Sequence, residues 1–200
     1  MNNNNSSKQI LLSVLGVAIL VVAVVGISFA AFSYSKTGSV ANTITTGTIT
    51  MSYSEPTNGI NLTNALPITD TAGKALKGDN NTFDFTVGAS VSGSTTINYV
   101  ITALPETGNT LNNAGVKVYL TDQKDTQILA PTKVSALSTT QANNAAGAPT
   151  GQFILKTGTY SASATDTYRL RMWVADDYAA PSTSQKYVLK VNVYGKAAAK

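Results

Sequence analysis

The feature that most constrains this chain is the apolar run over residues 10–31, ILLSVLGVAILVVAVVGISFAA, which contains no charged side chain. As a single helix rising about 1.5 Å per residue, a run of this length spans the hydrocarbon core of a membrane, which is about 30 Å thick. A polar stub, residues 1–9, precedes the run, and a polar sequence with strand-like patterning, residues 32–200, follows it. We therefore predict a cytoplasmic stub, a hydrophobic helix that contacts the membrane at least transiently, and one extracellular domain.

The fate of residues 10–31 has two interpretations. A permanent transmembrane anchor is favoured by the length of the run, because the apolar part of a signal peptide usually has about 7–15 residues. Cleavage by signal peptidase is favoured by the end of the run, where Ser28 and Ala30 put small residues at the −3 and −1 positions of a cleavage site. The mature chain would then begin at Ala31. Lys8 suits an orientation with the N-terminus inside the cell under either interpretation.

Cysteine and histidine are both absent from the sequence. Without cysteine, an exported domain must be stabilised by packing and hydrogen bonds instead of disulfides. Without histidine, serine–histidine and cysteine–histidine nucleophile pairs and HExxH zinc sites are impossible. Five aspartates offer oxygen ligands without EF-hand spacing, and we interpret them as solvated turn residues: Asp122, Asp125, Asp166, Asp176 and Asp177. We predict no enzymatic activity, no cofactor and no metal site.

The charge pattern gives little support to nucleic-acid binding. Fourteen basic and ten acidic residues leave a formal net charge of +4. The lysines are scattered along the chain, with no basic run and no interleaving of basic and aromatic residues. We therefore predict no nucleic-acid partner.

Residues 32–200 have the alternating pattern of half-buried β-strands. Phe83, Phe85 and Val87 alternate with polar residues, and similar alternation recurs in segments around residues 97–101, 116–120, 168–174 and 187–193. About eight short strands separated by turn residues, with no helical periodicity, predict an all-β fold. We expect an antiparallel β-sandwich of jelly-roll or immunoglobulin-like type, preceded by the single N-terminal hydrophobic helix. Residues 130–150, which are rich in small polar residues, are predicted to be a long exposed loop.

Two shorter motifs each have a functional and a structural interpretation. Leu104-Pro105-Glu106-Thr107-Gly108 matches the LPxTG pattern recognised by sortases, but nearly half the chain follows it, and we predict an ordinary turn after a strand. Arg169, Arg171 and Trp173 fall on one strand face, where they form either a ligand platform or an ordinary sheet face that is exposed or covered by the edge of the neighbouring sheet. We favour the ordinary sheet face.

The chain resembles the TasA/camelysin family of exported proteins from Gram-positive bacteria. The resemblance covers roughly residues 10–101 and rests on the segments SFAAFS, SVANTITTGTITMSYS, INLTNALP and NTFDFTVGASVSGSTTINYVIT. It implies a jelly-roll domain that serves as a secreted or surface-attached subunit of biofilm fibres. Relatives have been described as metalloproteases, an activity that we do not extend to a chain without histidine.

The resemblance also implies a role for the segment that follows the hydrophobic run. In such fibres the mature N-terminal segment, here residues 31–50, completes the sheet of a neighbouring subunit. The candidate assembly residues lie in and just after this Thr-rich segment: Ala41, Thr43, Ile44, Thr46, Ile49 and Met51. The alternative is that residues 43–53 form the first strand of their own domain, with Gly47 as a bulge or bend.

Together these patterns predict an exported structural subunit of a cell-surface or extracellular fibre of biofilm-matrix type, with other copies of itself as its partner. Its location would be extracellular or on the surface of a Gram-positive-type bacterium. The alternative is a membrane-anchored, monomeric β-sandwich that displays a binding surface. The two differ in whether the chain is cleaved after Ala30.

Overall fold

A computed structural model describes residues 33–37, 42–46, 49–56, 60, 62, 65–78, 81–92, 95–179 and 185–199. All of them belong to one compact unit, Ser33–Lys200. The predicted hydrophobic segment and the candidate residues Ser28, Ala30, Ala31 and Ala41 lie outside the described residues. Among the described residues, no helix is both long and apolar enough to cross a membrane.

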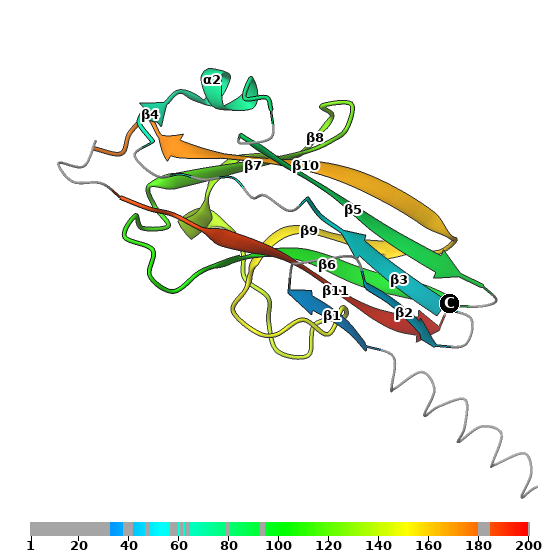
Figure 1. Cartoon of the computed structure of the whole chain (residues 1–200). Helices are drawn as coiled ribbons and strands as arrows, with labels where there is room; N and C mark the ends of the chain where they lie inside the picture. Colours follow the sequence, from blue (N-terminus) through cyan, green and yellow to red (C-terminus); the bar gives the residue numbers. More distant parts are fainter. Residues whose placement is uncertain are drawn as a thin grey trace, which may run out of the picture. The chain divides into compact units, whose positions relative to one another are not determined.

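Antiparallel pairing organises the unit into two sheets, which Figure 1 shows as two layers. The four-stranded sheet, here called sheet A, has the order β1 (Ser33–Thr37), β11 (Leu189–Ala199), β6 (Thr95–Pro105), β9 (Phe153–Tyr160). The larger sheet, sheet B, has the order β2 (Asn42–Thr46), β3 (Ile49–Ser54), β5 (Thr82–Val91), β10 (Ala164–Ala175), β7 (Val116–Asp122), β8 (Gln127–Lys133). A two-residue strand, β4 (Pro67–Ile68), pairs in parallel with the end of β10.

The strand order is that of a jelly roll. Without the added strands β2, β3 and β4, the remaining strands pair first with last, second with second-to-last, and so on inward: β1 with β11, β5 with β10, β6 with β9, and β7 with β8. All of these pairs are antiparallel, and each sheet receives alternate pairs. This is a long hairpin of eight strands rolled into two sheets. The prediction of an all-β, jelly-roll-like antiparallel sandwich is confirmed.

Residues 43–53 form a hairpin instead of one bulged strand. β2 pairs with β3 in an antiparallel register that places Ile44 opposite Met51 and Thr46 opposite Ile49. β3 in turn pairs with β5, so the hairpin extends sheet B beyond the jelly-roll strands. The predicted strand character is therefore right, but the chain reverses direction between Thr46 and Ile49, so that its two halves pair with each other.

The core lies between the sheets and consists of the inward-facing side chains of alternating residues. Phe85 and Val87 of β5 are buried as predicted. The most completely buried inward-facing side chains include Met51, Tyr53, Ile97, Ile101, Leu120, Leu170 and Val193. The two sheets approach closely where Met51 of β3 lies over Gly195 of β11, because a Cβ atom at Gly195 would overlap the Met51 sulfur. Only glycine gives β3 and β11 room to approach at this point.

Two connections are more ordered than the sequence predicts. A short helix, α2 (Asp70–Lys74), follows β4, and the Thr69 hydroxyl caps it by accepting a hydrogen bond from the Ala72 N–H. The sequence shows no helical periodicity here, because a helix of five residues is too short to have one. Residues 130–150 are not one exposed loop either. They include the end of β8, the single 3₁₀ turn η1 (Val134–Ala136), and a segment in which Ala146 and Ala148 are buried.

Because Gly195 is the residue that lets the sheets approach, Gly195→Ala is expected to destabilise the fold by about 1–3 kcal/mol through overpacking against Met51. The measurement is denaturant unfolding of the two single variants Gly195→Ala and Met51→Ala and of the double variant. We expect the double variant to cost clearly less than the sum of the singles, because its shorter side chain at position 51 relieves the overlap. Additive costs would contradict a direct contact between these residues.

Candidate assembly strands and surface sites

The first described strand, β1, is an edge strand at the start of the domain. Its five residues pair only with β11 among the described strands, in a register that runs from Ser33 opposite Lys196 to Thr37 opposite Asn192. β11 is held independently on its other side by β6 along its whole length. Removal of β1 would therefore leave the remaining sheet paired and would expose one edge of β11.

The candidate assembly residues are distributed over the neighbouring hairpin. Thr43, Ile44 and Thr46 lie in β2, the outermost strand of sheet B, whereas Ile49 and Met51 lie in β3. Met51 is fully buried in the core. The structure thus brings five of the six candidates together in one hairpin, which pairs with β5 of the same chain.

The face that carries Arg169, Arg171 and Trp173 is covered for part of its length. Trp173 packs directly against Gly73 of α2, and both Trp173 and Arg171 are only 1% exposed. The Arg171 guanidinium donates to the Leu76 carbonyl oxygen and forms an ion pair of 2.6 Å with Asp125. For these two residues the sheet face is therefore covered, and the cover is the segment after β4 instead of the edge of the neighbouring sheet.

Arg169 remains partly exposed and forms the best-defined ion pair of this face. Its Nε and Nη2 atoms donate to the two carboxylate oxygens of Asp84, at 2.8 and 2.7 Å. This hydrogen-bonded guanidinium lowers the pKa of Asp84 below its usual value. The hydrogen bond from Arg171 likewise lowers the pKa of Asp125.

The other aspartates considered as metal ligands have protein partners. Lys117 forms ion pairs with both Asp176 and Asp70, and Lys133 forms one with Asp177. The Asp122 carboxylate accepts hydrogen bonds from two backbone N–H groups of its own turn. In the part of the chain that the structure describes, no three carboxylates are grouped so that they could hold a metal ion.

A cluster of tyrosines, which the sequence analysis missed, crosses the sandwich near the β9–β10 connection. The Tyr99 and Tyr160 rings stack with centroids 4.6 Å apart, and the Tyr99 hydroxyl lies 3.2 Å from that of Tyr168. Tyr160 and Tyr168 both donate to the Asp166 carboxylate. Burial raises the pKa values of Tyr160 and Tyr168 above the usual range, so both phenols keep their protons and act as hydrogen-bond donors.

The LPETG sequence lies at the end of β6, where the chain turns. Leu104 is 38% exposed, and Gly108 adopts a positive φ of 89°. Hydrogen bonds join this turn to the segment before β11. The Glu106 N–H donates to the Val188 carbonyl oxygen, and the Asn109 side chain donates to that same oxygen and accepts from the Val188 N–H. The predicted turn is confirmed, and its glycine has the conformation that favours glycine.

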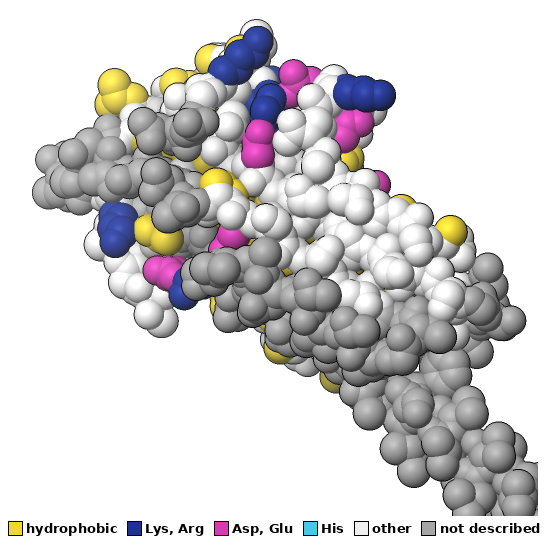
Figure 2. Space-filling view, turned by 45° about the vertical axis from the view of Figure 1, so that its right-hand side comes forward, with side chains coloured by type: hydrophobic (Ala, Val, Ile, Leu, Met, Phe, Trp, Pro, Cys, Tyr) yellow, Lys and Arg dark blue, Asp and Glu magenta, His cyan; other side chains and the backbone are white. Residues whose placement is uncertain are grey.

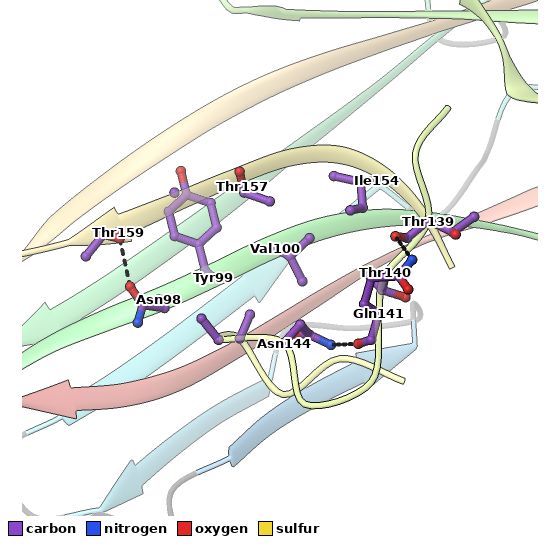
Figure 3. A pocket seen from close by; sticks show the side chains of 13 residues that line it. Asn98, Tyr99, Val100, Thr139, Thr140, Gln141, Asn144, Ile154, Thr157 and Thr159 are labelled. Atoms are coloured by element: carbon purple, nitrogen blue, oxygen red, sulfur yellow. Dashed lines mark hydrogen bonds between the residues drawn. The ribbon is translucent and has the colours of Figure 1, made fainter. Parts of the chain in front are cut away.

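A pocket of about 380 Å³ opens on the outer face of sheet A (Figure 3). Val100, Asn98 and Thr159 line it from strands β6 and β9, and the segment around Gln141 and Asn144 lines the opposite side. Asn144 holds that segment in place, because its side-chain amide donates to two backbone carbonyls and accepts from the Ala148 N–H. The sequence analysis missed this site, since one of its sides comes from a stretch interpreted as an exposed loop.

Comparison with known protein families, curated proteins and solved structures found no match. The assignment to the TasA/camelysin family therefore stays a prediction from the sequence. The class that the strand order itself defines is a jelly-roll sandwich with an added N-terminal hairpin.

The Asp84–Arg169 pair predicts a loss of stability in acid. Because the folded-state pKa of Asp84 lies below its unfolded value of about 3.9, the stabilisation is present above that value and is lost as the pH falls through the folded pKa. We expect the difference in unfolding free energy between pH 7 and pH 3 to be smaller in Asp84→Asn than in the unchanged protein. Denaturant unfolding at both pH values measures it, with Arg169→Gln as the partner control. An unchanged pH dependence in both variants would contradict the assignment.

The hydrogen bonds around the LPETG turn predict that it is protected from sortase in the folded chain. A sortase must bind these residues as an extended peptide, and here the strand end and the turn are paired with the segment before β11. We expect intact mass spectrometry to show no cleavage between Thr107 and Gly108 when folded protein is incubated with a sortase and triglycine. A peptide of residues 101–111 is the matched control and should be cleaved. Efficient processing of the folded chain would contradict the prediction.

Proposed function

We propose that this chain is an exported structural subunit of a cell-surface or extracellular fibre of biofilm-matrix type, in a Gram-positive-type bacterium. Its partner is then a second copy of itself. The observation that carries the proposal is the position of β1, a five-residue edge strand that begins two residues after the candidate cleavage point at Ala31. β1 is an edge strand of sheet A and the described strand nearest to the candidate cleavage point, so the domain can exchange it without unpairing an interior strand.

Assembly then follows from the pairing of β1 with β11. An empty β11 edge presents unpaired N–H and C=O groups, and β1 of another copy makes the same main-chain hydrogen bonds there. The donating strand and the accepting edge lie on different parts of each subunit. Such head-to-tail addition does not close on itself and gives a filament. The adjoining hairpin β2–β3 contains five of the candidate residues. In the exchange, β2 either moves to the other subunit together with β1 or stays paired with β3 of its own chain.

The surface charge suits close packing of copies. Figure 2 shows charged side chains at the top and on the left of the visible face, and few over the described residues toward its right-hand side. Exposed hydroxyl side chains lie on three neighbouring strands of sheet B: Ser54, Ser90, Thr165 and Thr167. Cleavage before Ala31 removes Lys8, the one charged residue of residues 1–30, and lowers the formal net charge from +4 to +3. Repulsion between subunits is correspondingly small.

A membrane-anchored, monomeric display module is the second candidate. The observation that favours it is that β1 and β2 both pair within their own chain. In that case residues 10–31 stay attached and the pocket on sheet A is the displayed site.

Engineered cysteines distinguish the two functions, because the natural chain contains none. Ser33→Cys and Lys196→Cys place one thiol on each side of the β1–β11 pair, at the Cα separation of an antiparallel pair, which a disulfide can bridge. We expect a mixture of the two single variants, recovered from cells as assembled material and oxidised, to give a cross-linked dimer on a non-reducing gel. Each single variant alone is the control. It should give no dimer cross-linked between positions 33 and 196.

The corresponding pair in the hairpin, Thr43→Cys with Ser52→Cys, shows how far the exchanged segment extends. A cross-linked dimer from this mixture means that β2 is exchanged together with β1. If neither mixture cross-links, while both double variants form intramolecular disulfides in the same material, the proposal of strand exchange is overturned. That result would support the display module.

A further inference from the structure

We propose that the pocket on the outer face of sheet A is a binding site for an uncharged saccharide. The pocket has a volume of about 380 Å³, within the range of about 300–1,000 Å³ for small-molecule sites. It lies between strands β6 and β9 and the segment 139–146, which folds against the sheet (Figure 3). This inference does not depend on whether the chain forms fibres.

The floor of the pocket is apolar and rigid. Val100 is 3% exposed and packs with Ala146 and Tyr194, and Ile154 packs against this cluster. The segment that forms the wall is fixed from below by buried Gln152, which accepts a hydrogen bond from Thr102 and donates one to the Tyr194 hydroxyl. The site is therefore already formed in the absence of a ligand.

The rim of the pocket offers uncharged hydrogen-bonding groups. The side-chain carbonyl oxygen of Asn98 accepts a hydrogen bond from the Thr159 hydroxyl. The NH₂ group of the same Asn98 side chain has no partner among the described residues. Thr157, which pairs with Val100 across the strands, is exposed, and its hydroxyl is likewise unpaired within the described part of the chain. The Gln141 NH₂ group donates to the Thr139 carbonyl, and its side-chain oxygen is available on the exposed side. These groups include both donors and acceptors.

No charged residue lines the pocket. Two lysines, Lys156 and Lys196, are neighbours of lining residues in the chain or in the strand register. The Lys156 ammonium lies 5.6 Å from the centre of the Tyr168 ring, on the inner side of β9, and Lys196 is opposite Asn98 in the strand register without lining the pocket. A charged ligand would thus lose hydration without gaining an ion pair. A sugar ring, with C–H faces for the floor and hydroxyl or acetamido groups for the rim, fits this chemistry.

The test uses the full-length chain in a detergent without a sugar headgroup, with amide NMR spectra as the readout. The probes are chitotriose, cellotriose and trigalacturonate, each at up to about 20 mM, since a shallow site of this kind binds with a Kd of about 0.1–10 mM. We expect saturable shifts of amides in segments 98–100, 139–146 and 157–159 with chitotriose or cellotriose. A response to chitotriose alone assigns a role to the acetamido group.

Three variants make the test specific. Thr157→Trp fills the pocket from an exposed position and should weaken binding at least about tenfold, while Thr132→Trp on β8, the edge strand of sheet B, should leave it unchanged. Gln141→Ala, also at an exposed position, provides a second test if Thr157→Trp does not fold. Lys196→Ala should have no effect. The proposal is overturned if no neutral probe shifts these amides, if Thr157→Trp and Gln141→Ala bind as well as the unchanged chain, or if trigalacturonate binds in a manner that Lys196→Ala abolishes.

Discussion

The contact between Met51 and Gly195 is the point on which the arrangement of the two sheets depends. Met51 belongs to the N-terminal hairpin that extends sheet B, and Gly195 belongs to the central part of sheet A. The Tyr53 hydroxyl, two residues further along β3, reaches the Val191 carbonyl of the same strand β11. A domain without disulfides must join its sheets by such packing. Strand β3 of the N-terminal hairpin is therefore part of the core, and β1 is a separate edge strand.

The strands with strict alternation could be predicted from the sequence, because one face of each is apolar. Phe85 and Val87 of β5 and Leu170 and Met172 of β10 were assigned correctly for this reason. The pairing order could not be predicted, since it depends on contacts between strands far apart in the chain. Helix α2 was missed because a single turn has no period, and β2–β3 was interpreted as one strand because its turn has no Asn-Gly signal.

The candidate sites could be predicted only in part. The cleavage motif and the Thr-rich segment are local in sequence, so they were visible, and the LPETG turn was recognised from its proline and glycine. The pocket depends on a loop of small polar residues whose Asn144 bonds its own backbone and whose Gln152 reaches three residues of sheet A. Composition alone makes such a segment resemble an exposed loop. Burial of Arg171 and Trp173 was likewise hidden, since it results from a segment that begins at residue 65.

Whether the chain is released after Ala30 decides between an assembling subunit and a tethered module. The N-terminal residue and mass of the native protein, determined by intact mass spectrometry after cell fractionation, measure this directly. Our account predicts a chain that begins at Ala31 and is found in the medium or in fibres. A full-length chain confined to the membrane fraction would contradict it, because residues 1–30 would then tether β1 and prevent its addition to another subunit.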